Sequence, residues 1–588
     1  MKILNRIRST FESLRMSIRR FPITVIISTV LALSLIYLNE TDITGPALEN
    51  MVRLNMVLGM GIVLSLCFGL SIEKFFSKNR ITSIVIYLGG GLMLALYHRF
   101  FLQEVNSLTA SRYSGFLIFL LLAFLYIPRL RENEDYEYYI LDIYHGFAIT
   151  VSYALVLYIG LSAIFLTIDQ LFDANIPGKL YYYIFLTISL VFSVPLFLAN
   201  LPPMGAKYRN FEYNKALRVL LTFIVIPLIS IYSIILYVYF AKILVSREWP
   251  KGLVSHLVIW YSTLSVGVIF LLNPIIDTNR VAKSFKVIFP KAILPILLMM
   301  FISIFQRVSQ YGVTENRYYI IALGLWVLTI MLYFIIQKNL KNTFITISLS
   351  LVVLISVLGP VSSFSISKYS QNKRLENILS RNNMIVGGSI VPNADISQGD
   401  QREVSNILTY FNQNHKLSDI RLLPETFDFD NMEGLMGFNY NPYSLDINQR
   451  GSYFYYGTSL DSPIDVRNFD YYLSMNSWDE KPRELEDFSV EYKGISKSLV
   501  VRKAGEIVLE QDMETLVKEI SKIEGADFNI KKNFLSVEDM TFETSYMGAS
   551  GGVEFKIIFL SANGRLDEEN DIILEGADFI LLIGEDRT

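Results

Sequence analysis

The chain contains very little cysteine and histidine: one cysteine, Cys67, and four histidines in 588 residues. A single thiol excludes an internal disulfide, so every folded part must be held together by its own core. The last third has His415 as its only histidine, which argues against a zinc site with the usual ligands and against a Ser-His-Asp catalytic set. The sequence thus predicts no metal and no cofactor, and it favours a protein that is not an enzyme.

Charge is also scarce before Ser367, although 18% of the whole chain is charged and 52% is hydrophobic. The part before Ser367 holds 30 basic and 17 acidic residues, a net charge of +13, whereas the remainder holds 22 and 38, a net charge of -16. So much apolar side chain exceeds what one soluble core needs. We therefore predict two domains, a membrane domain over residues 1–366 and a water-soluble domain over residues 367–588.

Long apolar runs predict about eleven transmembrane helices, since a helix needs about 20 apolar residues to cross the hydrocarbon. Two of the predicted spans, 114–127 and 293–305, have apolar cores short enough to be re-entrant. A wrong count at either one would reverse the topology. The predicted spans are residues 21–38, 51–70, 81–97, 114–127, 146–172, 181–201, 217–240, 253–275, 293–305, 319–336 and 344–364.

The distribution of basic residues predicts the orientation, because lysine and arginine collect in cytoplasmic loops. With the N-terminus inside, the inner segments carry 21 basic residues and the outer segments carry 9. A chain that begins inside the cell and crosses the membrane an odd number of times ends outside. We therefore expect a multi-pass membrane protein with a cytoplasmic N-terminus and an extracytoplasmic C-terminal domain.

Few polar side chains lie within the predicted spans, where they are costly and commonly functional. The candidate intramembrane polar residues are Asp142, His145, Asp169, Gln170 and His256, with Arg53 and Asn273 at span ends. A structural role near the lipid head groups is the alternative for each of them. No span carries a charge near its middle, which weakens the case for an ion-coupled transporter.

Three consecutive glycines, Gly89 to Gly91, lie in the third predicted span. They remove side chains over one helical turn and so favour close approach of a neighbouring helix, with a helix break as the alternative.

The soluble domain is predicted to be α+β with a mainly antiparallel sheet. Residues 367–385 and 401–415 show helical spacing of apolar side chains, and a hairpin turns near Lys503 to Gly505. A further helix follows at 513–523, and about three strands complete the chain. The aromatic-rich stretch 437–457 suits either stacking on sugar rings or packing in a core.

Three stretches of the sequence carry a family resemblance: "RFPITVIISTVLALSLIY", "GPVSSFSISKYSQNKRLENILSRNNMI" and "VRNFDYYLSM". They resemble a family of bacterial integral membrane proteins known as domain of unknown function 4153. The resemblance extends over most of the chain and implies a protein of the bacterial plasma membrane, and it assigns no functional residue.

These features leave three functions open. The first is an extracytoplasmic binding or sensing module in the cell envelope; the second is a transporter or flippase of a small or lipid-linked substrate; the third is a membrane enzyme acting on lipid-linked or sugar substrates. The expected partners are the lipid bilayer and an envelope protein, glycan or lipid-linked ligand. Nucleic acid is not expected, because the soluble part is acidic.

Overall fold

A computed structural model describes most of the chain, and it divides into two compact units. The first unit comprises Met1–Asn377 and Phe411–Arg421, and the second comprises Ile378–Tyr410 and Leu422–Thr588. The described residues are 12, 14–41, 43–76, 79–131, 135–208, 213–246, 253–337, 341–424, 426–440, 453–458, 463–479, 481–494, 496–523, 533–548, 551–566 and 572–585.

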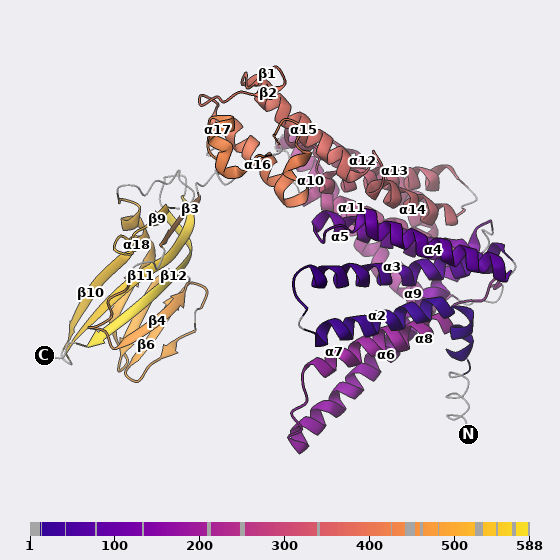
Figure 1. Cartoon of the computed structure of the whole chain (residues 1–588), viewed down its shortest axis with the longest axis horizontal. Helices are drawn as coiled ribbons and strands as arrows, with labels where there is room; N and C mark the ends of the chain where they lie inside the picture. The colour runs from indigo at the N-terminus through magenta and orange to yellow at the C-terminus, as the bar shows by residue number, and fades with distance from the viewer. Residues whose placement is uncertain are drawn as a thin grey trace. The chain divides into compact units, whose positions relative to one another are not determined.

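The first unit is a bundle of helices (Figure 1). Among the described residues, ten helical stretches are long and apolar enough to cross a membrane. Short π-helical turns, Thr187–Phe192 and Leu220–Val225, join helices within two of these stretches. The helices are α2 Pro22–Glu40, α3 Pro46–Phe75, α4 Arg80–Phe101, α5 Ser107–Tyr126, α6 Tyr136–Phe172, α7 Lys179–Leu186, α8 Ser193–Ala199, α9 Lys215–Val219, α10 Ile226–Ser246, α11 Leu253–Leu272, α12 Arg280–Tyr311, α13 Glu315–Ile336, α14 Thr343–Val357 and α15 Ser363–Arg381.

The predicted membrane helices agree with these elements. The two shortest predicted spans, 114–127 and 293–305, belong to helices of full length, since α5 with its following 3-10 turn has 23 residues and α12 has 32. The eleventh predicted span corresponds to α14, which has only 15 residues. At 1.5 Å per residue α14 is about 22 Å long, less than the hydrocarbon core of about 30 Å.

Hydrogen bonds and ion pairs divide the helix termini between two ends of the bundle. At the first end, Arg20 before α2 pairs with Glu73 near the end of α3. At the second end, Lys179 at the start of α7 pairs with Glu40 at the end of α2, and Arg53 near the start of α3 donates to the carbonyl of Leu102 after α4. Successive helices therefore run in alternating directions.

Helix α14 runs from the first end of the bundle to the second, antiparallel to α13. Near its start Asn342 donates to Glu137, at the beginning of α6. Midway, Trp326 of α13 donates to Ser348 of α14 over 3.0 Å. Beyond its end the carbonyl of Val361 accepts from Tyr318, in the first turn of α13. The short α14 and the residues after it thus return the chain to the end where α13 begins.

Close packing against α5 fixes the position of α14. A Cβ atom added at Gly115 of α5 would lie 2.3 Å from Cγ1 of Val357, so only glycine allows this approach. Gly90 makes a similar contact with Phe68 of α3, while Gly89 and Gly91 face open space. Helix α4 is continuous through all three glycines, which confirms close approach rather than a helix break.

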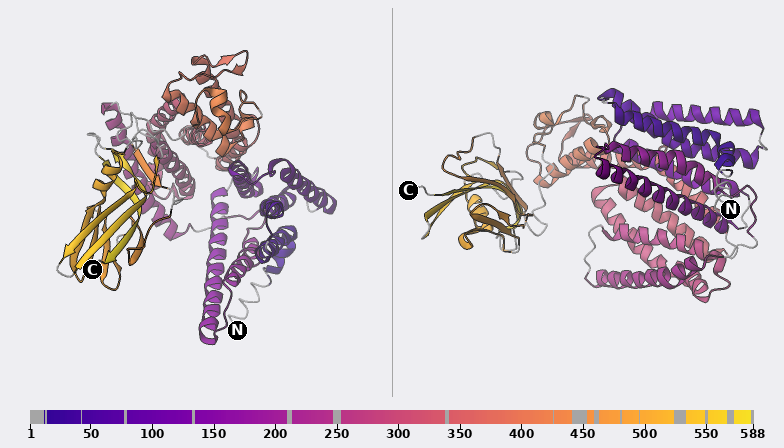
Figure 2. Two further views of the ribbon diagram at one scale, coloured as in Figure 1. Left: turned by 60° about the vertical axis from the view of Figure 1, so that its left-hand side comes forward. Right: turned by 90° about the horizontal axis from the view of Figure 1, so that it is seen from below.

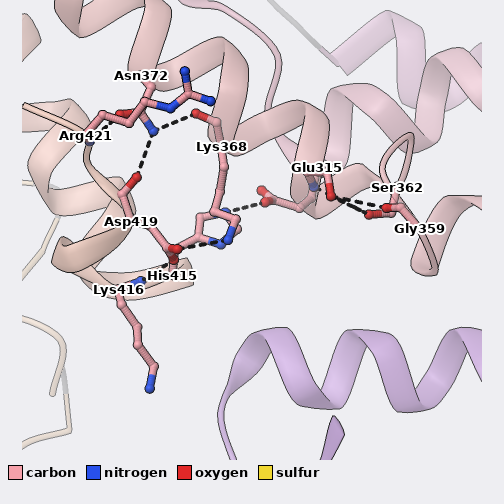
Figure 3. Close-up of polar contacts among 10 residues, drawn as sticks. Glu315, Gly359, Ser362, Lys368, Asn372, His415, Lys416, Asp419 and Arg421 are labelled. Atoms are coloured by element: carbon pink, nitrogen blue, oxygen red, sulfur yellow. Dashed lines mark hydrogen bonds and ion pairs between the residues drawn. The ribbon is translucent and has the colours of Figure 1, made fainter. Parts of the chain in front are cut away.

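The segment Phe411–Arg421 belongs to the bundle although it lies in the polar part of the sequence. His415, whose side chain is fully buried, lies 2.7 Å from Glu315 at the start of α13 (Figure 3). Asp419 pairs with Lys368 of α15 over 2.9 Å, and Lys416 reaches Glu104, between α4 and α5. The segment is therefore held on the second end of the bundle.

Besides the short antiparallel pair of β1 and β2, the described part of the second unit contains two larger sheets (Figure 2). Buried residues of both larger sheets form one core. One sheet has the order β4-β12-β11-β3-β9, with β10 also paired to β11, and the other has the order β5-β6-β7-β8; only β3 and β9 are parallel. The strands are β1 Ile385–Val386, β2 Ser389–Ile390, β3 Tyr453–Thr458, β4 Tyr471–Asn476, β5 Arg483–Glu484, β6 Phe488–Lys493, β7 Ser498–Lys503, β8 Glu506–Asp512, β9 Asn533–Leu535, β10 Thr541–Gly548, β11 Gly551–Leu566 and β12 Ile572–Glu585, and the helices are α16 Gln398–Asn414, α17 Met432–Met436 and α18 Met513–Ile520.

Alternation of apolar residues produces the core between the sheets. Phe488, Val490 and Tyr492 of β6 are buried at every second position, and α18 adds Leu516 and Val517 to the same cluster. The hairpin predicted near Lys503 joins β7 and β8 in antiparallel register. The predicted α+β class with a mainly antiparallel sheet is confirmed. Residues 441–452 of the aromatic-rich stretch lie outside the described residues.

Gly115→Ala should destabilise the bundle, because the added methyl group must displace Val357. Overpacking of this kind typically costs about 1–3 kcal/mol, so we expect a lower unfolding temperature of the purified full-length protein. Gly89→Ala is the matched control, because its methyl group would enter open space. Equal unfolding temperatures for the two variants would contradict the close contact between α5 and α14.

Asp400→Asn should destabilise the second unit at neutral pH and have little effect in acid. Burial raises the pKa of Asp400, but hydrogen bonds from Arg381 and Asn382 outweigh it, so the net pKa is lowered. Because the pKa of Asp400 is lower in the folded state, its ionised carboxylate stabilises the fold at pH values above the unfolded-state pKa of about 3.9. This stabilisation is lost as the pH falls through the folded-state pKa. We expect a loss of a few tenths to about 1 kcal/mol at pH 7, measured by denaturant unfolding.

The control for this prediction is Asp465→Asn. Asp465 pairs with Arg467, whose side chain is 87% exposed, so solvent screens the interaction and its loss should matter less. A larger effect at Asp465 than at Asp400, or an effect of Asp400→Asn that does not shrink in acid, would contradict the assignment.

Candidate functional site

A layer of buried polar groups lies at the first end of the bundle, around the start of α6. Arg20 donates from Nε and Nη2 to both carboxylate oxygens of Glu73, at 3.0 and 2.9 Å. The same guanidinium donates to the carbonyl oxygens of Leu201 and Pro202, which follow α8. One arginine therefore ties α2, α3 and the loop after α8 together, and the two-point contact fixes its orientation.

A second arginine, Arg129, is almost fully buried in this layer at 6% exposure. Its guanidinium lies over the rings of Tyr139 and Tyr208, 5.1 and 5.4 Å from their centroids, and donates to the carbonyl of Ala206 over 2.7 Å. Tyr208 in turn donates to Asp142 over 3.1 Å. Cation–π contact and hydrogen bonding together offset the cost of burying this charge.

Beside these residues, Glu137 forms the centre of a network of side chains from four elements. Its Oε1 accepts from the amides of Asn273, at 2.8 Å, and of Asn342. Lys286 of α12 donates to Oδ1 of Asn273 over 3.1 Å, so one amide bridges the carboxylate and the ammonium group. Glu137 and Asn342 are 7% and 2% exposed, and such a buried carboxylate needs these donors.

A large cavity of about 780 Å³ extends from this layer toward the middle of the bundle. It lies among α2, α3, α5, α6 and the stretch from α7 to α8, and 16 of its 22 lining residues are apolar. Several hydroxyl groups in its wall are bonded within the protein, including Thr150 to Gly146 and Ser193 to Ile188. The cavity therefore offers apolar surface to a ligand.

The cavity opens on the side of the bundle and adjoins the polar layer. Phe147, Val151 and Leu155 of α6 line it and are exposed on the surface of the bundle. At the end of the cavity nearest the polar layer, Ile143 and Thr24 line the wall. Ile143 follows Tyr139 of the polar layer by one helical turn, and Thr24 follows Arg20 by one turn. An elongated molecule in the cavity could thus reach charged groups at one end and lipid along its side.

The five polar residues predicted within the membrane do not meet in one site. Asp142 binds Tyr208 in the polar layer, and His145 is exposed one turn further along α6. Asp169 accepts from the backbone amide of Ile176 over 2.7 Å, which caps the loop after α6, and Gln170 beside it is exposed. Residues 142 and 169 lie about 40 Å apart along the helix at 1.5 Å per residue, and His256 is exposed on α11.

Sequence reasoning identified Asn273 but missed Glu137, Asn342 and Arg129 as members of a site. Each of the three lies in a segment between predicted spans, where a polar residue is ordinary. One signal was available: these three residues fall in segments predicted to be cytoplasmic, and Asn273 lies at the cytoplasmic end of the predicted span 253–275. Nothing in the spacing showed which of these segments touch.

The bundle, its apolar helices and the buried polar layer define a multi-pass membrane protein. A family model described as domain of unknown function DUF4153 matches residues 25–385. This match covers the membrane part and more than half of the chain, so the chain belongs to the DUF4153 family.

One curated relative is an uncharacterized protein of Pasteurella multocida (strain Pm70), 24% identical over 287 residues. The match covers 49% of this chain and 49% of the relative, so it spans about half the length of that protein. No solved structure matches the chain.

Proposed function

We propose that the protein is a lipid-handling membrane protein that takes the hydrocarbon chain of a lipid or lipid-linked substrate into the cavity beside α6. The observation that carries the proposal is the cavity itself: about 780 Å³, mostly apolar and open at the side of apolar helices. Its size falls within the roughly 300–1,000 Å³ of ligand pockets. Lipid chains are the apolar molecules that surround such helices.

The position of the polar layer suits a substrate with a polar head. Arg20 lies one helical turn before Thr24 of the cavity wall, and Asp142 directly precedes Ile143, another residue of the wall. This arrangement favours the transporter or flippase function over an ion carrier, because the cavity is lined by neither Asp169 nor His256.

We further propose that the second unit lies outside the cell and presents a binding surface there. Support comes from the direction of α14, because this helix returns the chain to the end of the bundle where α13 begins. This direction favours eleven crossings of the membrane. The segments predicted to be cytoplasmic by their basic residues are the ones that meet at the first end of the bundle. An envelope protein or a glycan is the expected partner of this unit.

Filling the cavity should reduce lipid binding. Ala154 of α6 lines the cavity, and Ala154→Trp would occupy space that a chain needs. We expect crosslinking to a photoactivatable phospholipid in reconstituted vesicles to fall by about tenfold, the effect of about 1.4 kcal/mol. Ala163→Trp, on the same helix at an exposed position, is the matched control and should crosslink as the unmodified protein does. Equal crosslinking of both variants would refute the proposal.

Cysteine labelling should place the second unit outside. With Cys67→Ser removing the only thiol, Trp478→Cys offers a site in the second unit at a residue that is 78% exposed. A membrane-impermeant maleimide should label this variant in intact cells. Asp277→Cys, at an exposed position of the first end, should be labelled only after the cells are opened. The reverse pattern would place the unit in the cytoplasm.

A further inference from the structure

Three hydrogen-bond donors without partners lie together near the second end of the bundle. The hydroxyl of Tyr97 and the Nε atoms of Arg53 and Arg112 are buried, and they have no hydrogen-bond partner within the described part of the chain. Tyr97 as a whole is only 7% exposed. A buried donor without a partner destabilises a fold, and a charged donor does so more strongly. Three such donors close together therefore indicate that an acceptor binds there.

Ring contacts hold these donors in one cluster. Tyr97 stacks on Phe101, with ring centroids 5.6 Å apart, and the guanidinium of Arg112 lies 5.3 Å from the centroid of Phe101. Arg53 donates from Nη1 to the carbonyl of Leu102, the next residue in the chain. The three donors therefore converge on the end of α4 from helices α3, α4 and α5.

Arg112 has a cationic side chain without a carboxylate partner among the residues described. Its guanidinium lies over the rings of Phe101 and Phe364, 5.3 and 5.0 Å from their centroids. Rings attract the faces of a guanidinium, so the N–H donors around its edge stay available. Arg53 is partly neutralised by Glu49, at 3.5 Å. The cluster thus combines positive charge with donors that match an anion.

We propose that Arg112, Arg53 and Tyr97 form a binding site for a phosphate group. Two phosphate oxygens can accept a pair of parallel hydrogen bonds from one guanidinium group. A phosphate oxygen can also accept a hydrogen bond from the hydroxyl of a tyrosine. Arg53 and Arg112 lie seven and five residues from the starts of α3 and α5, about 10 and 8 Å along their helices. That depth is close to the level of lipid head groups, and basic pockets between membrane helices bind such groups. The site is separate from the cavity and does not depend on its function.

The test measures thermal unfolding of the full-length protein in a phosphate-free maltoside detergent. Three ligands are titrated: short-chain phosphatidic acid, the matching diacylglycerol and inorganic phosphate. We expect phosphatidic acid to raise the unfolding temperature of the unmodified protein, since a ligand that binds only the folded state stabilises it, and diacylglycerol to have no effect. Stabilisation by inorganic phosphate at the same concentrations would identify a soluble phosphate rather than a lipid as the source.

Arg112→Gln and Tyr97→Phe should each weaken binding, by about tenfold for the arginine, because that substitution removes charge-assisted hydrogen bonds to the phosphate. Arg99→Gln removes a charge from an exposed position of α4 and should bind as the unmodified protein does. Tyr97→Phe still tests the site if Arg112→Gln fails to fold. Without a ligand this substitution only removes an unsatisfied hydroxyl, so the unfolding temperature should be unchanged or higher. No shift with either phosphate compound, or unchanged affinity in Tyr97→Phe, would overturn the site.

Discussion

Lipid offers no hydrogen bonds, and this constraint arranges the polar groups of the bundle. Within the helices, hydroxyl groups bond to carbonyls one turn earlier, as Thr150, Ser262 and Ser265 do. The larger polar side chains collect at the two ends, where helix termini supply free backbone groups. The interior is left mainly apolar, which agrees with the mostly apolar wall of the large cavity.

Residues at the two ends show different ways of balancing a charge. At the first end Arg20 faces a carboxylate in a two-point contact, and Glu137 receives two amides. At the second end Arg112 contacts aromatic rings. A balanced layer stabilises packing between helices, whereas positive charge with free donors favours an anionic ligand. The proposed phosphate site therefore lies at the second end, and the polar end of the cavity lies at the first.

Sequence patterns predicted much of the fold because they report directly on burial. Runs of apolar residues marked the membrane helices, and alternation marked strands such as β6. The length of α14 was harder to predict, because apolar residues continue past Val357 while the helix ends there. The place of Phe411–Arg421 in the bundle could not be predicted, since its helical spacing looks like that of any soluble helix.

The candidate sites were less predictable, because depth in a membrane can be estimated from sequence but partners cannot. Asp169 was singled out for its place near the end of a span, yet it caps a loop. Arg112 was counted only as a basic residue of an outer segment, and its neighbours Tyr97 and Phe101 come from another helix. Glu137 and Asn342, 205 residues apart, meet through folding alone.

The anchored segment Phe411–Arg421 gives the polar tail a second attachment to the membrane part. One attachment is covalent, through α15, and the other consists of the ion pairs of His415, Lys416 and Asp419. A protease that nicked the chain between these two points would leave both fragments joined. After such a cut, the ion pairs of this segment would hold the two fragments together in place of the peptide bond.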